Sequence, residues 1–135
     1  MDIINSQTIY TGLFFLFILL SGFWVARTGK PYNTVVFNIH KFIGLGLGYF
    51  LIRIVYLTNQ AAPLNAIQWT AIAVTVFLFV FTVAAGGLLS ILAEGGLKNM
   101  GQGIKSAISL VHKFFPGLIA LLTAITLYLL LFRNS

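Results

Sequence analysis

The sequence predicts an all-α membrane protein, an antiparallel bundle of four transmembrane helices built from two tandem helix hairpins. Composition is one reason: 59% of the 135 residues are hydrophobic and 7% are charged, too few polar side chains to cover a soluble domain. Distribution is the other, because the apolar residues form four runs near the ~20 residues that a spanning helix needs. We expect a single transmembrane domain over residues 1–135, with helices at about 8–26, 35–57, 66–93 and 107–132.

The segments between the runs predict how the helices are joined. Residues 28–33, Thr-Gly-Lys-Pro-Tyr-Asn, have the composition of a turn, and Asn33 or Thr34 is expected to cap the second helix. The connection around Pro63 is short, which favours antiparallel neighbours. A glycine-rich stretch, 94–103, leads into the fourth helix. Along the later helices we expect hydroxyls to bond the backbone one turn back, at Thr70, Thr75, Thr82, Thr123 and Thr126.

Positive charge is concentrated around two loops. Six of the eight basic residues flank the first and third connections: Arg27, Lys30, Lys41, Lys98, Lys105 and Lys113. The positive-inside rule then places these loops in the cytoplasm and both termini outside, in an integral protein of the bacterial cytoplasmic membrane. The net charge of +6 is therefore not interpreted as a nucleic-acid signal. The expected partner is the lipid bilayer, including its anionic lipids.

Several chemistries lack the residues they need. The chain has no cysteine, which excludes disulfides, iron–sulfur clusters and thioether-linked haem. Asp2 and Glu94 are the only carboxylate side chains, so acid–base catalysis inside the membrane has little support. No catalytic residue is predicted, and the enzyme class left open is a membrane electron-transfer oxidoreductase.

Two matching strings contain the only histidines: Ile39-His40-Lys41-Phe42 and Val111-His112-Lys113-Phe114. Each histidine lies about five residues into its predicted helix, on the same side of the membrane. Imidazoles from two facing helices can bind one haem iron from both faces. We therefore predict that His40 and His112 are the metal ligands of one haem b per chain.

Small and basic residues near the histidines extend this candidate site. Gly44 and Gly48 follow His40 on the same helical face, and Gly22 and the pair Gly86-Gly87 bring small residues to the same half of the membrane. The flanking cations could pair with haem propionates. The candidate cofactor-binding set is His40, His112, Gly44, Gly48, Gly22, Gly87, Lys41, Lys113 and Arg27.

Other interpretations fit the same residues. The Gly44-x-x-x-Gly48 spacing is also typical of close helix packing. The histidines could form a polar contact or a proton-carrying pair, and a zinc site would need a further ligand such as Glu94. In a different class, the chain would be a haem-free accessory or structural subunit, or a small transport protein, that oligomerises through glycine faces.

Residues 22–53 resemble the prokaryotic four-helix cytochrome b family of di-haem, superoxide-oxidase type. Gly22-Phe23-Trp24 is similar to that family's Gly-Leu-Trp, and His40-Lys41-Phe42-Ile43-Gly44 to its His-Lys-x-x-Gly motif. The resemblance implies that His40 is an axial ligand, with His112 in the place of its partner. It also implies single-electron transfer to or from a quinone or a partner protein, in a homo-oligomer or a larger complex.

The chain departs from this family at two points. The family has two more histidines for a second haem, whereas residues 7–10 and 125–128 contain none here, so one haem is implied. Its His-Lys side faces the periplasm, whereas the charges here predict the cytoplasm. Arg53 falls where the family often has an arginine. It lies about 20 Å along the helix from His40, and we expect it to snorkel to the opposite interface or, as a weaker alternative, to bind a quinone or lipid headgroup.

Overall fold

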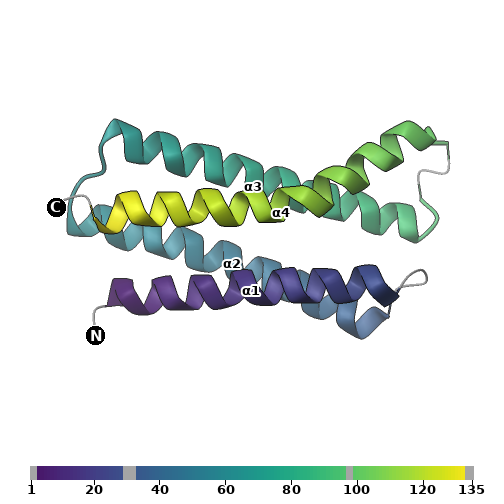
Figure 1. The fold of residues 1–135 in the computed structure, drawn as a ribbon, viewed down its shortest axis with the longest axis horizontal. Coiled ribbons are helices and arrows are strands. Elements are labelled where there is room, and N and C mark those ends of the chain that lie inside the picture. The colour runs from purple at the N-terminus through teal and green to yellow at the C-terminus, as the bar shows by residue number, and fades with distance from the viewer. Residues whose placement is uncertain (1–2, 29–32, 97–98, 133–135) are drawn as a thin grey trace. The chain divides into compact units, whose positions relative to one another are not determined.

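The computed structural model describes residues 3–28, 33–96 and 99–132. These residues contain no strand, and all the helices are long and apolar enough to cross a membrane. The structure therefore confirms the predicted all-α class with four transmembrane helices (Figure 1). The helices are α1 (Ile3–Thr28), α2 (Thr34–Ala61), α3 (Ala66–Ala93) and α4 (Gln102–Leu131).

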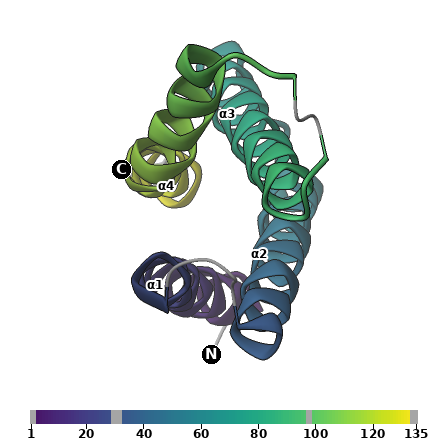
Figure 2. The same ribbon diagram turned by 90° about the vertical axis from the view of Figure 1, so that its right-hand side faces the viewer.

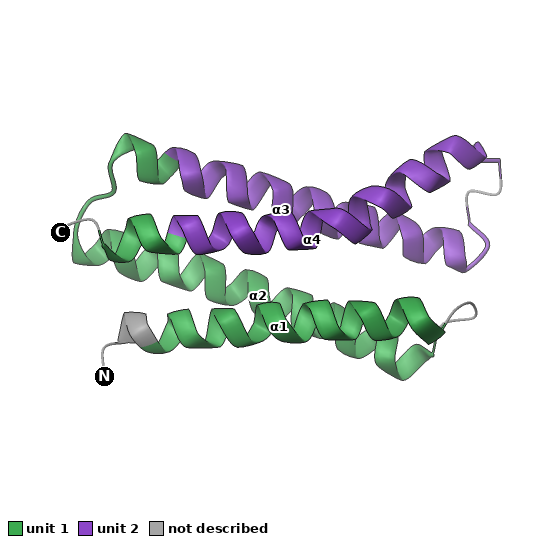
Figure 3. Ribbon diagram, viewed as in Figure 1, with its two compact units in different colours: residues 1–69, 127–135 green, residues 70–126 purple. Residues whose placement is uncertain are grey.

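The chain divides into two compact units (Figure 3). Unit 1 comprises residues 1–69 and 127–135, so it contains the α1–α2 hairpin with the first turn of α3 and the end of α4. Unit 2 comprises residues 70–126 and contains the bodies of α3 and α4. Within unit 1, α1 and α2 run side by side in opposite directions, as Figures 1 and 2 show.

The predicted helix bounds agree best with the observed ones where the apolar run extends to the end of the helix. Helix α3 begins and ends as predicted, but α4 begins at Gln102, five residues before the predicted start. Residues 102–106 are mostly polar or small and do not belong to the apolar run. The Gly101 carbonyl nevertheless accepts from the N–H groups of Ile104 and Lys105, at 3.1 and 3.2 Å. His112 is thus ten residues into α4 and His40 six into α2, so the equal spacing predicted from the helix starts is wrong.

Side-chain caps fix the starts of α2 and α3. The Asn33 side chain accepts from the N–H groups of Val35 and Val36, at 3.0 and 3.2 Å, which confirms the predicted cap. Asn65 and Gln68 form a reciprocal pair in which each backbone N–H donates to the other side chain, both at 2.9 Å. This capping box satisfies donors that the first turn of a helix leaves without helical acceptors.

Gln68 also joins two helix ends within unit 1. Its side chain is 3% exposed, and its Nε2 donates to the carbonyl of Leu129 at 2.8 Å. That carbonyl lies in the last turn of α4, where helical donors run out. One buried amide therefore caps the start of α3 and satisfies the end of α4.

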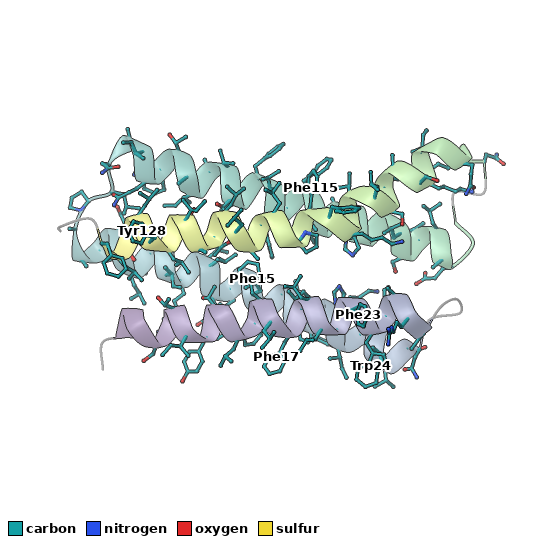
Figure 4. All side chains as sticks on the ribbon, viewed as in Figure 1. Phe15, Phe17, Phe23, Trp24, Phe115 and Tyr128 are labelled. Atoms are coloured by element: carbon teal, nitrogen blue, oxygen red, sulfur yellow. The ribbon has the colours of Figure 1, made fainter. Side chains whose placement is uncertain are left out.

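Aromatic rings fill the seam between α1 and α2. The Phe14 ring packs directly against the backbone of Gly46, where a Cβ would collide with it. Phe50 lies 4.9 Å from Phe14 and 5.7 Å from Tyr10, between ring centroids. On the outer side of α1, Phe17 and Trp24 are 52% and 61% exposed (Figure 4), as expected of side chains that face lipid.

Helix α4 bends midway along its length (Figure 1). Pro116 lies inside the helix, and proline has no N–H to donate to the carbonyl four residues earlier. That carbonyl belongs to His112. The interrupted turn therefore runs from His112 to Pro116, and Phe115 within it packs on Phe81 of α3 at 5.9 Å between centroids.

Candidate functional site

His40 is held by a serine of the neighbouring helix. Its Nδ1 lies 2.9 Å from Oγ of Ser21 on α1, and Ser21 is buried. The Ser21 hydroxyl donates its single proton to the carbonyl of Ile18, at 3.2 Å. With its proton on that bond, the hydroxyl oxygen accepts from the Nδ1–H tautomer of His40. These two contacts fix the orientation of the ring.

His112 is held in the same way by the backbone of α3. Its Nδ1 lies 3.2 Å from the carbonyl oxygen of Thr82. Because a carbonyl only accepts, Nδ1 of His112 carries the proton and donates it. In a neutral imidazole of this tautomer the lone pair is on Nε2. Many metal-binding histidines have this arrangement, in which one ring nitrogen donates its proton to a carbonyl and the other nitrogen coordinates the metal.

Each imidazole lies against a glycine. A Cβ on Gly22 would stand 3.1 Å from Cε1 of His40, and a Cβ on Gly86 would stand 2.6 Å from Cε1 of His112. Neither distance leaves room for an ordinary side chain without a shift of the ring. The two histidines, both half-buried, thus occupy notches that the glycines create.

The two hairpins can be aligned around these notches. When Gly22 is aligned with Gly86, Ser21 falls on Ala85 and Ile18 on Thr82. Where the first hairpin has a serine hydroxyl between the imidazole and the carbonyl, the second has an alanine, and the imidazole reaches the carbonyl directly. The difference in bonding thus coincides with the difference between Ser21 and Ala85.

The repeat extends along the helices that carry the histidines. When His40 is aligned with His112, the buried residues of α2 fall on buried residues of α4. The aligned pairs are Leu47 with Ile119, Ile54 with Thr126, and Thr58 with Leu130. The tandem-hairpin interpretation thus has support from burial as well as from the two His-Lys strings.

The other candidate glycines have different surroundings. A Cβ on Gly87 would meet nothing within 4 Å, so the glycine against His112 is Gly86. A Cβ on Gly44 would lie 3.6 Å from Cδ1 of Ile18, an ordinary contact in the α1–α2 seam. Gly48 is half-buried on α2. The role of these glycines as space for a macrocycle stays a prediction.

The candidate cations are exposed and close to the histidines in sequence. Arg27 lies over the Phe23 ring at 4.6 Å, and Lys41 over the Phe37 ring at 4.2 Å. Lys113 is exposed on α4. Lys30 and Lys98 lie outside the described residues. These cation–π contacts hold Arg27 and Lys41 in the last turn of α1 and the second turn of α2, the end of the hairpin that carries His40.

His40 belongs to unit 1 and His112 to unit 2, and the structure describes each unit by itself. Their opposition across one cofactor stays a prediction. Over residues 3–28, 33–96 and 99–132, no three His, Cys, Asp or Glu side chains gather as a metal-binding group. The zinc alternative, with Glu94 as a third ligand, stays a prediction.

Buried hydroxyls line unit 2, and the prediction that they bond the backbone was wrong at Thr75, Thr82, Thr123 and Thr126. Thr75 and Thr126 bond each other across the helices, at 3.1 Å. Among the described residues, the hydroxyls of Thr82 and Thr123 are buried without a hydrogen-bond partner. The predicted bond from a threonine hydroxyl to the carbonyl one turn back is found in α1, where Thr11 donates to the carbonyl of Gln7 at 2.8 Å.

Sequence reasoning missed the partners of both imidazoles. Ser21 was recognisable only as a small polar residue before a glycine, and the Thr82 carbonyl gives no signal in a sequence because every residue has one.

The four apolar helices define an integral membrane protein that contacts the lipid bilayer. No protein-family model, no curated protein and no solved structure matches this chain.

Proposed function

We propose that this chain is a small b-type membrane cytochrome in which His40 and His112 bind one haem. It would pass single electrons to or from a quinone or a partner protein. The observation that carries the proposal is the repeated imidazole setting, in which Nδ1 lies within hydrogen-bond distance of an oxygen on the neighbouring helix and a glycine lies against the ring. Two such settings in one small membrane chain would supply the two histidine ligands of one haem.

A shared Nδ1–H tautomer would favour a metal over a direct contact between the histidines. In that tautomer a neutral imidazole has its lone pair on Nε2. Two lone pairs cannot form a hydrogen bond with each other. They can share an electrophile, and an iron ion would accept both nitrogen donors. A shared proton would place a positive charge among apolar helices, which is costly.

The remaining candidate residues have supporting roles. Haem supplies a one-electron couple when bound. The Ser21 hydroxyl and the Thr82 carbonyl orient the rings. By accepting a hydrogen bond from Nδ1–H they would also make Nε2 a stronger metal ligand. Arg27, Lys41 and Lys113 would pair with propionate groups as charge partners.

The test is the spectrum and haem content of the purified full chain. We expect a reduced-minus-oxidised difference spectrum with b-type bands and one haem per chain. H40A and H112A should each remove the low-spin bands, and the double variant should contain no haem. F42L is the matched control, because Phe42 is near His40 in sequence but 72% exposed, and its spectrum should be unchanged.

A colourless protein would overturn this proposal, as would bands that persist in the H40A/H112A double variant. If the colourless chain purifies with other membrane subunits instead, the accessory-subunit alternative is favoured. Loading with haem during expression in a haem-supplemented culture separates a missing cofactor from a missing site.

A further inference from the structure

A cation and two phenols lie together on an outer face of α2. Tyr49, Arg53 and Tyr56 are spaced four and three residues apart, which places them on one side of a helix. Tyr49 and Tyr56 are 56% and 61% exposed, and Arg53 is exposed too. The same face carries Leu45 and Ile52, whose side chains are exposed as well. It is therefore a lipid-facing surface that contains a polar group.

The arginine and the first tyrosine already form a pair. Nη1 of Arg53 donates to the phenol oxygen of Tyr49 at 3.0 Å. Tyr49 accepts this bond, so its own O–H proton is left to donate elsewhere. A guanidinium has five N–H donors and no acceptor. The pair therefore presents donors and a full positive charge, which is the chemistry that recognises an anion.

The hairpin core positions the tyrosine of this pair. The Tyr49 ring meets the Phe50 ring edge-on, at 5.5 Å between centroids. Phe50 in turn packs against Phe14 and Tyr10 of α1. The phenol is thus supported through a cluster of rings from two helices, and the donor is in place before any ligand arrives.

The depth of Arg53 in the membrane explains why its side chain needs an anionic partner. Arg53 lies eight residues before the end of α2 at Ala61, which is about 12 Å along the axis. The 28-residue helix is about 42 Å long, against ~30 Å of hydrocarbon. A centred helix would put the Cα of Arg53 about 6 Å inside the hydrocarbon. A cation at this depth is stabilised by an anion or by the headgroup layer.

We propose that Arg53 and Tyr49, with Tyr56 beside them, bind the phosphate of an anionic phospholipid. The charge decides the ligand class, because a quinone carbonyl would accept the hydrogen bonds but leave the guanidinium uncompensated. The sequence itself has two acidic residues against eight basic ones. The surrounding face of leucine and isoleucine suits the acyl chains of the same lipid.

The test is native mass spectrometry of the full chain, exchanged in detergent with equal amounts of phosphatidylglycerol and phosphatidylcholine. The wild type should retain phosphatidylglycerol roughly fivefold better, as expected for one well-placed basic side chain. R53Q should abolish this preference, and R53K should weaken it because lysine lacks the planar fork. Y49F should weaken it as well. R27Q removes a cation from the opposite end of the hairpin, and this variant should retain the preference for phosphatidylglycerol.

Circular dichroism of each variant establishes that the helices are intact. Equal retention of the two lipids by the wild type would overturn the site, and so would an equal loss in R27Q and R53Q. Binding of a ubiquinone analogue that R53Q abolishes while lipid retention is unchanged would also overturn it, as would a bound polypeptide released only by R53Q.

Discussion

Nδ1 of His112 lies 3.2 Å from the carbonyl oxygen of Thr82, four residues before the glycine that the ring touches. The equivalent carbonyl of the first hairpin, that of Ile18, accepts from the hydroxyl of Ser21, and Oγ of Ser21 lies 2.9 Å from Nδ1 of His40. Equivalent carbonyls thus lie near the two histidines, in direct contact with Nδ1 in one hairpin and connected to it through a hydroxyl in the other. The two hairpins share this arrangement, although few of their residues are identical.

The notch at Gly86 should tolerate an added methyl poorly. A Cβ there would stand 2.6 Å from the His112 ring, against 3.1 Å for Gly22 and His40. We expect G86A to lower the free energy of unfolding by about 1–3 kcal/mol through overpacking, and G22A to cost less. Thermal unfolding in detergent measures this. G87A is the control: its Cβ meets nothing, so it should be neutral or stabilising, and a larger loss in G87A than in G86A would contradict the assignment.

The hydroxyl of Ser21 should contribute a modest amount to stability. In S21A the Ile18 carbonyl becomes available to His40, as the Thr82 carbonyl is to His112, so the histidine exchanges one acceptor for another. We expect a loss of about 0.5–1.5 kcal/mol, measured by denaturant or thermal unfolding. T28A removes an exposed hydroxyl bonded to the Val25 carbonyl at 3.0 Å and should cost less. A collapse of S21A would mean that the direct bond cannot form in the first hairpin.

The two kinds of buried threonine in unit 2 should respond oppositely to valine. T82V removes a hydroxyl that is buried without a partner among the described residues, and it retains the backbone carbonyl that holds His112. We expect T82V to be neutral or to stabilise by about 1 kcal/mol. T75V leaves the Thr126 hydroxyl without its partner and should destabilise by a similar amount. Thermal unfolding of both variants distinguishes them, and equal effects would argue against this hydrogen-bond pattern.

Gln68 should be the most sensitive polar residue of unit 1. It makes three hydrogen bonds while 3% exposed. Q68L removes its side-chain bonds to the Asn65 N–H and to the Leu129 carbonyl, and we expect a loss of about 2–4 kcal/mol. Q68E keeps the acceptor for Asn65 but cannot donate to Leu129 and buries a charge, so it should be no better. Q60A, at an exposed position, is the control in the same unfolding measurement.

The sequence predicted the helices well because membrane insertion selects long apolar runs, and α3 is correct at both ends. The start of α4 was missed because residues 102–106 are polar, and a helix can continue beyond the lipid where apolar content no longer marks it. The cap at Asn33 was readable because its side chain performs the capping. Gly86 could not be told from Gly87, since adjacent helical residues point about 100° apart and only the packed structure shows which one faces the partner.

The mirrored hydrogen bonds have a consequence for biogenesis. His40 is oriented by α1 and His112 by α3, so each ring is set by a partner that precedes it in the same hairpin. Each hairpin can therefore orient its own histidine as it enters the membrane, before the other hairpin is inserted. If the chain is cut in the loop at Pro63 and the two pieces are co-expressed, both imidazoles should still be oriented.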